Sequence, residues 1–177
     1  MATPTIRPSP TPSATPTGSP ALLSLSYATT GNQAQTNTIG LKVQLTNLGS
    51  AINLSSLKIR YYYTSEPSSA NSVTVDYASV VNGSTHSALT GQVSGGVILL
   101  SSPKTGADRY VELGFASASP SLASSGTAEI QLRITNQQWS NFSQTDDYSF
   151  LSSAQSYALN PKVVLLKDGT IVSGAAP

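Results

Sequence analysis

The chain's only tryptophan, Trp139, lies next to a run of oxygen-bearing side chains. Its neighbours are polar, namely Gln137, Gln138, Ser140 and Asn141. A lone tryptophan in a domain of this size is often a core anchor, but this polar context and the lack of apolar alternation favour an exposed ring. The sequence therefore predicts that Trp139 is a surface group able to stack on a flat polar ligand.

The strand expected just before this tryptophan has one apolar and one polar face. Its apolar positions, at a period of two, are Ala128, Ile130, Leu132 and Ile134. Gln131 and Arg133 then project outward, about 7 Å apart. With Trp139 they form a surface that can stack on, and hydrogen bond to, a flat ligand. The alternative is an ordinary solvated strand face.

The acidic residues and the single histidine do not match the pattern of residues that hydrolases use for catalysis. The chain has eight Asp and Glu residues and no cysteine. Glycoside hydrolysis needs two carboxylates that face each other, whereas the neighbours Asp146 and Asp147 point to opposite sides of an extended backbone. His86 lies in a Ser/Thr-rich loop without a Gly-x-Ser-x-Gly elbow, and zinc ligands are lacking. The residues therefore disfavour a hydrolase active site.

Calcium is the metal that the residues favour, because it prefers hard oxygen ligands. Two loops are rich in such oxygens, at residues 64–66 and 143–147. An Asx-turn or a salt bridge explains the same residues equally well.

Composition indicates one neutral domain. The 177 residues have a formal net charge of +1, and only 10% of them are charged, which does not favour nucleic acid or an anionic membrane as a partner. No run approaches the roughly 18 apolar residues of a membrane span. A signal peptide is not evident and Met1-Ala2 leads straight into a Pro/Thr tract, so we expect a piece of a longer protein. The composition is that of a secreted-type domain, and we expect it to be monomeric.

Residues 1–20 are expected to form a disordered linker. They contain six prolines and eight serine or threonine residues, a composition typical of an extended, semi-rigid spacer between modules. A disordered cloning remnant is the alternative.

Residues 21–177 alternate in the manner of an all-β sandwich. Nine strands are expected, at 22–28, 38–47, 57–64, 73–77, 97–100, 110–115, 127–134, 163–166 and 170–172. Asp168-Gly169 predicts a hairpin between the last two strands, and Asn82-Gly83 predicts another tight turn.

Ordered segments over most of residues 21–177 resemble a family 3 carbohydrate-binding module, the cellulose-binding domain of cellulases and cellulosomal scaffolding proteins. The matching segments are Thr46-Asn47-Leu48-Gly49, Ile52-Asn53-Leu54-Ser55, Leu57 to Thr64, Asp76-Tyr77-Ala78, Gly106-Ala107-Asp108, Val111 to Phe115, the Trp139 segment and Asn160-Pro161-Lys162-Val163. The resemblance implies a nine-stranded antiparallel jelly roll with a structural calcium.

The same resemblance implies a flat strip that lies along crystalline cellulose. Its members here are Asp76, Tyr77, His86, Arg133 and Trp139, and we call this set the strip. Asn37 and Gln131 match the family's polar anchors. At the last aromatic position of the strip this chain has Thr85 and His86 in place of tyrosine.

The calcium ligands implied by the resemblance are Thr64, Glu66, Ser143, Asp146 and Asp147. Glu66 is longer than the family's usual aspartate. Two further departures, Thr74-Val75 in place of Trp-Cys and Ser173 in place of a C-terminal tryptophan, leave the strip largely intact.

These features predict a non-catalytic module that attaches a secreted cellulase or scaffolding protein to crystalline cellulose. The alternatives are a catalytic-adjunct module of a cellulase, a polysaccharide-sensing ectodomain and a stand-alone hydrolase. The strip residues disfavour the adjunct and the missing carboxylate geometry disfavours the hydrolase, whereas a sensor would use the same surface.

Overall fold

The computed structural model describes residues 22–65 and 70–177, and nearly all regular structure in them is antiparallel β-sheet. The linker expected at residues 1–20 and the ligand candidate Glu66 lie outside the described residues. No helix in these two ranges is long and apolar enough to cross a membrane.

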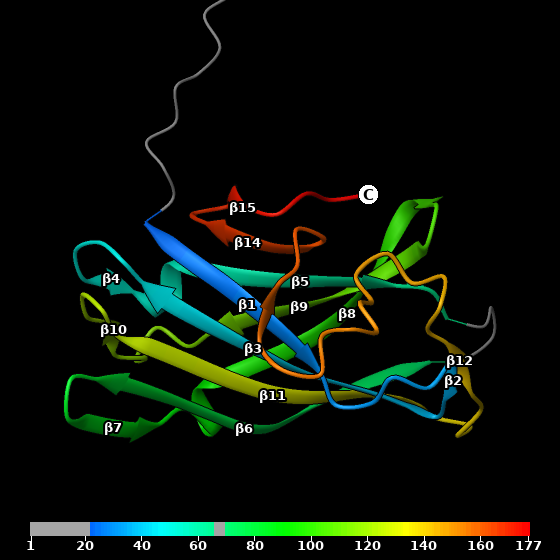
Figure 1. Ribbon diagram of the computed structural model, residues 1–177, viewed down its shortest axis with the longest axis horizontal. Coiled ribbons are helices and arrows are strands. Elements are labelled where there is room, and N and C mark those ends of the chain that lie inside the picture. Colours follow the sequence, from blue (N-terminus) through cyan, green and yellow to red (C-terminus); the bar gives the residue numbers. More distant parts are fainter. Residues whose placement is uncertain (1–21, 66–69) are drawn as a thin grey trace, which may run out of the picture.

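Two main sheets form the sandwich (Figure 1). The six-stranded sheet contains, in spatial order, β13 (Ala158–Leu159), β1 (Leu23–Thr29), β3 (Thr38–Asn47), β11 (Thr127–Asn136), β6 (Asn71–Asn82) and β7 (Thr85–Ala88). The five-stranded sheet contains β15 (Thr170–Ser173), β14 (Val163–Lys167), β5 (Leu57–Tyr63), β9 (Ala107–Phe115) and β8 (Val93–Lys104).

Short elements complete the fold at the ends of the sandwich. They are the pair β4 (Ile52–Asn53) and β10 (Ser121–Leu122), the pair β2 (Gln35–Thr36) and β12 (Phe142–Ser143), and the 3-10 turns η1 (Leu54–Ser56) and η2 (Thr90–Gln92). All nine expected strands are present among the two main sheets, so the all-β antiparallel sandwich is confirmed.

The core lies between the inner faces of the two sheets. In β3 the residues alternate strictly between buried and half-buried positions, so that Ile39, Leu41, Val43 and Leu45 all face inward. Large rings fill the space opposite, and Tyr27 of β1 stacks on Tyr61 of β5 with ring centroids 5.9 Å apart. Period-two alternation therefore leaves the outer face of the six-stranded sheet for polar side chains.

The turns follow the sequence signals. Asp168 and Gly169 both have positive φ, 49° and 81°, and connect β14 to β15. Gly83, with φ 61°, lies in the turn between β6 and β7. Residues 85–88, expected to be part of a loop, instead form strand β7, because this turn folds them back onto β6.

Candidate functional site

A β-bulge in β6 places Asp76 and Tyr77 side by side on the outer face. Gln131 of β11 pairs with Tyr77, while the next residue, Leu132, pairs with Val75, so Asp76 is an extra residue in β6. Both Asp76 and Tyr77 are consequently exposed, although a regular strand would bury one of two neighbours. The bulge thus supplies two adjacent functional side chains from one strand.

Arg133 of β11 forms an ion pair with Asp76 across this bulge. Arg133 Nε lies 3.4 Å from Asp76 Oδ1, and the two side chains are 53% and 42% exposed. An exposed pair of this kind contributes at most about 1 kcal/mol to stability. Its effect is to hold the guanidinium and the carboxylate together on the outer face.

Tyr77 also contacts His86, the single histidine of the chain. Tyr77 Oη lies 3.4 Å from His86 Nε2, and both side chains are exposed. His86 is in β7, where it pairs with Val81 of β6. Strand β7 therefore brings the histidine beside the aromatic ring.

Trp139 is 66% exposed and has a positive φ of 57°. Positive φ is uncommon for a bulky residue, so the surrounding loop has to hold it there. The buried Asn136, at the end of β11, does so. Its Oδ1 accepts hydrogen bonds from the backbone N–H groups of Gln138 and Ser140, both 3.0 Å away, and its Nδ2 donates to the Ser140 carbonyl at 2.7 Å.

The two expected polar anchors lie on either side of Arg133 along the sheet. Gln131 is half-buried next to Tyr77 and donates from Nε2 to Glu129 Oε1 over 2.7 Å. Asn37 is exposed and directly precedes Thr38, which pairs with Thr135 near the end of β11. Asn37 is therefore near the tryptophan end of the strip, and Gln131 near its tyrosine.

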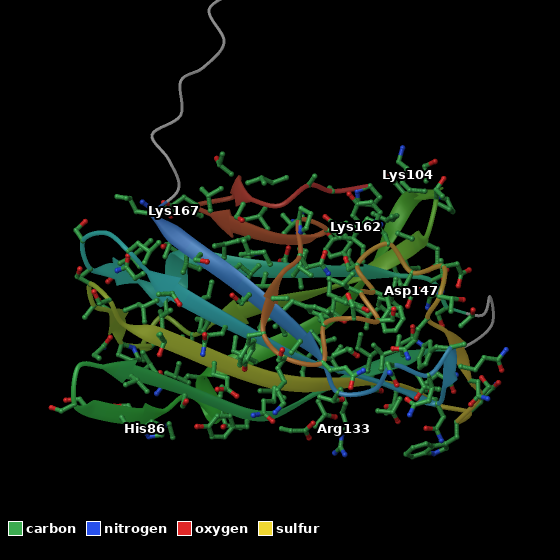
Figure 2. The ribbon with its side chains drawn as sticks, in the orientation of Figure 1. His86, Lys104, Arg133, Asp147, Lys162 and Lys167 are labelled. Carbon is green, nitrogen blue, oxygen red and sulfur yellow. The ribbon has the colours of Figure 1, made fainter. Side chains whose placement is uncertain are left out.

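The candidate calcium ligands lie in a different part of the molecule. Figure 2 shows His86 and Arg133 on one side of the sandwich and Asp147 among the loops at one end. Asp147 Oδ1 accepts two hydrogen bonds from Thr64, from its backbone N–H at 2.7 Å and its hydroxyl at 2.8 Å. The sequence-predicted pair Thr64 and Asp147 is thus brought together.

Asp147 is a buried carboxylate whose second oxygen, Oδ2, has no hydrogen-bond partner. Burial raises the pKa of Asp147 to about 7, against the opposing effect of the two Thr64 hydrogen bonds. A buried, unpaired carboxylate oxygen is costly unless a cation or proton neutralises it. This oxygen beside a threonine hydroxyl fits a hard cation such as calcium.

The other candidate ligands are less fully placed. Asp146 is exposed, and it shares with Asp147 a cavity of about 530 Å³ that Lys104, Tyr148 and Lys162 help to line. Ser143 is half-buried in β12. No group of three or more acidic or histidine side chains able to hold a metal occurs in residues 22–65 and 70–177, so a cation here would depend on hydroxyl and carbonyl oxygens as well.

Gly106 positions the Asp147 loop against the turn between β8 and β9. A Cβ at Gly106 would lie 2.4 Å from the carbonyl oxygen of Asp146, and its φ is 74°. The Gly106 carbonyl accepts a 2.7 Å hydrogen bond from the N–H of Tyr148. Glycine is required because no other residue allows this close approach.

Two features that position the candidate residues were not predicted from the sequence. The bulge at Asp76 leaves only a weak signal, which is the change of apolar phase from Val73 and Val75 to Ala78 and Val80. The signal for Asn136 is an asparagine just after an alternating strand, a frequent start of an Asx-type turn.

Comparison with known proteins agrees with this arrangement. The profile of the cellulose binding domain family matches residues 24–174. The chain belongs to this family of cellulose binding domains.

The sequence of this cellulose binding domain is 37% identical over 157 residues to cellulose-binding protein A of Clostridium cellulovorans. That match covers 88% of the chain but only 8% of the relative, so the chain spans a small part of that protein.

Two solved structures have closely similar folds. A family IIIA cellulose-binding domain from Clostridium cellulolyticum has a TM-score of 0.84 and 34% identity, over 89% of this chain and 98% of that one. A module with flanking linkers from the scaffoldin of Clostridium thermocellum has a TM-score of 0.84 and 31% identity, over 89% and 92%. The antiparallel jelly-roll sandwich of the cellulose binding domain follows from these matches.

Proposed function

We propose that this domain binds crystalline cellulose through the strip. The observation that supports the proposal is the row of exposed groups on the outer face of the six-stranded sheet, which contact one another in pairs. In this row Arg133 pairs with Asp76, and Tyr77, the next residue along β6, contacts His86. Trp139 is exposed in the loop that follows β11.

The chemistry of these groups suits the surface of a β-1,4-glucan. The rings of Tyr77 and Trp139 stack on the C–H faces of glucose units, and the Asp76–Arg133 pair exchanges hydrogen bonds with hydroxyl groups. Asn37 and Gln131 bind hydroxyls at either end of this pair. Many modest contacts on a rigid, repeating ligand add up to useful affinity, because little ligand entropy is lost.

The proposal includes a structural calcium ion at Asp147. Asp147 and Thr64 would hold it, with Ser143, Asp146 and Glu66 as further ligands. Support comes from the unpartnered buried Oδ2 of Asp147 and from the raised pKa of this carboxyl. A bound cation would supply the neutralising charge and tie the end of β5 to the loop that follows β12.

We further propose that the domain is a non-catalytic, monomeric part of a secreted cellulase or scaffolding protein, tethered by residues 1–20. The small share of cellulose-binding protein A that the chain matches supports a multimodular parent. A polysaccharide-sensing ectodomain is the alternative, since such a receptor would use the same surface. A catalytic adjunct is disfavoured by the exposed Tyr77 and Trp139.

The deciding experiment is retention of the full chain on microcrystalline cellulose, with an assay for released reducing sugar. We expect retention, no sugar release, and poor competition by short soluble cello-oligosaccharides, because these cannot span the strip. Tyr77→Ala should weaken retention, whereas Leu99→Ala, at a residue 67% exposed on the other sheet, should not. A folded, calcium-loaded chain that is not retained would refute the proposal.

A further inference from the structure

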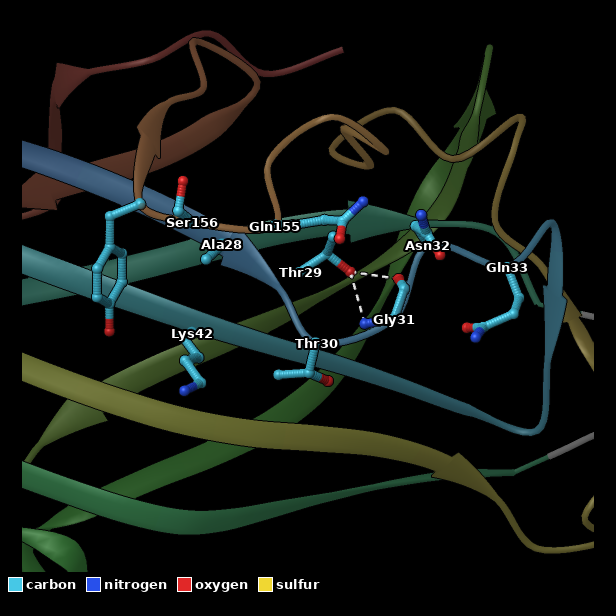
Figure 3. A pocket seen from close by; sticks show the side chains of 10 residues that line it. Ala28, Thr29, Thr30, Gly31, Asn32, Gln33, Lys42, Gln155 and Ser156 are labelled. Atoms are coloured by element: carbon cyan, nitrogen blue, oxygen red, sulfur yellow. Dashed lines mark hydrogen bonds between the residues drawn. The ribbon is translucent and has the colours of Figure 1, made fainter.

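A polar cavity of about 470 Å³ lies on the β1 and β3 side of the strip (Figure 3). This volume is within the range of about 300–1,000 Å³ that is usual for small-molecule sites. The lining residues are Ala28, Thr29, Thr30, Gly31, Asn32, Gln33, Lys42, Gln155, Ser156 and Tyr157. None of them is a strip residue or an expected anchor.

The strand register places one wall of this cavity directly beside the strip. Lys42 of β3 pairs with Gln131 of β11, and Gln131 in turn pairs with Tyr77 of β6. Neighbouring strands are about 4.8 Å apart. Lys42 in the cavity wall is therefore only two strands away from Tyr77 and from a ligand that lies on Tyr77.

A second contact connects the cavity to Arg133. Gly40 pairs with Arg133, and the side chain of Thr30 lies over Gly40, where a Cβ would come within 2.0 Å of Thr30 Oγ1. The N–H of Thr30 also donates to the Gly40 carbonyl at 2.9 Å. Because Gly40 has no side chain, Thr30 in the cavity wall can lie against β3 next to Arg133, which forms the ion pair with Asp76.

Local hydrogen bonds form the cavity in advance of any ligand. Thr29 Oγ1 donates to the Gly31 carbonyl and accepts from the Gly31 N–H, at 2.5 Å and 3.3 Å (Figure 3). The Thr29 N–H donates to the carbonyl of Ala154 at 2.7 Å, and this hydrogen bond joins the end of β1 to the segment that forms the opposite wall of the cavity. Such a site needs little reorganisation to bind.

The lining groups match a neutral sugar. Hydroxyl and amide side chains predominate, Lys42 is the one charged lining residue, and Tyr157 supplies a half-buried ring. The Tyr157 hydroxyl is buried near Glu129, so this residue offers its ring to the cavity. Burial, with a contribution from Glu129, raises the pKa of Tyr157, so its phenol stays protonated.

We propose that this cavity binds a neutral single-sugar branch of a soluble β-1,4-glucan whose main chain lies on the strip. A flat crystalline cellulose face has no branch to insert, so the cavity would add affinity for branched chains only. The inference rests on the proposed function, because the strip has to hold the main chain.

The test is affinity electrophoresis of the full chain in gels that contain one of two soluble polysaccharides. Xyloglucan is a β-1,4-glucan with xylose branches, and mixed-linkage β-glucan has none. We expect stronger retardation by xyloglucan. Gln155→Trp, which fills the cavity, and Lys42→Ala, which removes one donor, should reduce this preference about tenfold and about threefold. Ser152→Trp, exposed in the same loop but outside the lining, is the matched control.

Retention on microcrystalline cellulose separates this inference from the proposed function. If Gln155→Trp lowers xyloglucan binding and leaves cellulose retention unchanged, the cavity is a branch site. Equal retardation of the parent by both soluble polysaccharides, or unchanged xyloglucan binding in Gln155→Trp and Lys42→Ala, would overturn the branch site even where cellulose retention is intact. A parent chain that is not retained on cellulose would instead refute the proposed function itself.

Discussion

Trp139 combines high exposure with an unfavourable backbone conformation, which is typical of a residue kept for binding. Its side chain makes few contacts that stabilise the fold, since the residue is 66% exposed. We expect Trp139→Ala to weaken retention on cellulose about thirtyfold, the effect of losing one aromatic hot spot. Quantitative adsorption isotherms would measure this loss.

The melting temperature distinguishes this role from that of a core anchor. Alanine at position 139 keeps the same positive φ of 57°, so strain does not change much, and we expect a shift of only about 1–2 °C. Leu99→Ala, at a residue 67% exposed on the five-stranded sheet, controls for loss of exposed apolar surface. A fall of ten degrees or more in Trp139→Ala would mean that the ring is structural.

The loop that presents Trp139 depends on Asn136, which itself faces no ligand. Asn136→Ala would remove the side-chain hydrogen bonds to Gln138 and Ser140 and leave the partly buried backbone groups of this loop without these partners. We expect a loss of about 1–3 kcal/mol in the free energy of unfolding and weaker retention on cellulose. Because Trp139 is the only tryptophan, its fluorescence would report directly on the disturbed loop.

Asn136→Asp is the informative partner variant. Aspartate keeps the two acceptor contacts to the N–H groups of Gln138 and Ser140 and loses the donor contacts to Ser140. Partial recovery of both fluorescence and retention is expected. Full retention by Asn136→Ala would show that Trp139 finds its position without this support.

The turn at Gly106 has the same kind of role for the Asp147 loop. Gly106→Ala would force a Cβ to within 2.4 Å of the Asp146 carbonyl at a φ of 74°. We expect it to lower the free energy of unfolding by more than the roughly 1 kcal/mol due to positive φ alone. Chemical denaturation in the presence of calcium would measure the difference.

Gly83→Ala is a matched control, since Gly83 has a φ of 61° but no atom within 4 Å of the added Cβ. It should therefore show only the conformational penalty. Equal losses in the two variants would mean that the loop yields to the clash, and that Gly106 does not fix the position of Asp147.

The alternation of apolar and polar residues was enough to predict the longer strands. It did not predict the local irregularities that decide which side chains are exposed. The apolar period located strands such as β3, β9 and β11, because each of them buries one face against the core. The bulge at Asp76 was not predictable, since it arises from a register shift against β11 that only the paired strands reveal. Strand β7 was likewise missed, because its four residues are mostly exposed and show no apolar face.

Trp139, Arg133 and Gln131 were predicted from strand alternation and polar context and the other candidates from a family resemblance, and the structure brings several of them together. Asp76 meets Arg133, Tyr77 meets His86, and Thr64 meets Asp147. The cavity beside β3 could not be predicted, because it depends on the loop containing Gln155 lying against the turn after β1. Contacts between segments more than 100 residues apart leave no local pattern.

At the scale of the whole molecule, the charge of Asp147 should couple folding to pH and, if the proposed ion binds, to calcium. In the native state burial raises the pKa of this carboxyl from an ordinary value of 3.8 to about 7. Without calcium the folded protein therefore holds a proton that the unfolded chain releases between these values. The free energy of unfolding should then fall as pH rises from about 4 to 7, by a few kcal/mol at most, and level off above 7.

Calcium should remove this fall, because the ion replaces the proton on the buried carboxylate and neither the folded nor the unfolded chain then binds a proton there above about pH 4. Denaturation across pH 4–8, in chelator and in excess calcium, would give two curves that separate as pH rises, with calcium stabilising most above pH 7. Asp147→Asn keeps an acceptor for Thr64 without the charge, so its stability in chelator should vary little over this range and calcium should add little. A parent chain whose stability in chelator rises with pH would show that Asp147 is ionised in the fold without a cation, and the calcium proposal would lose its physical basis.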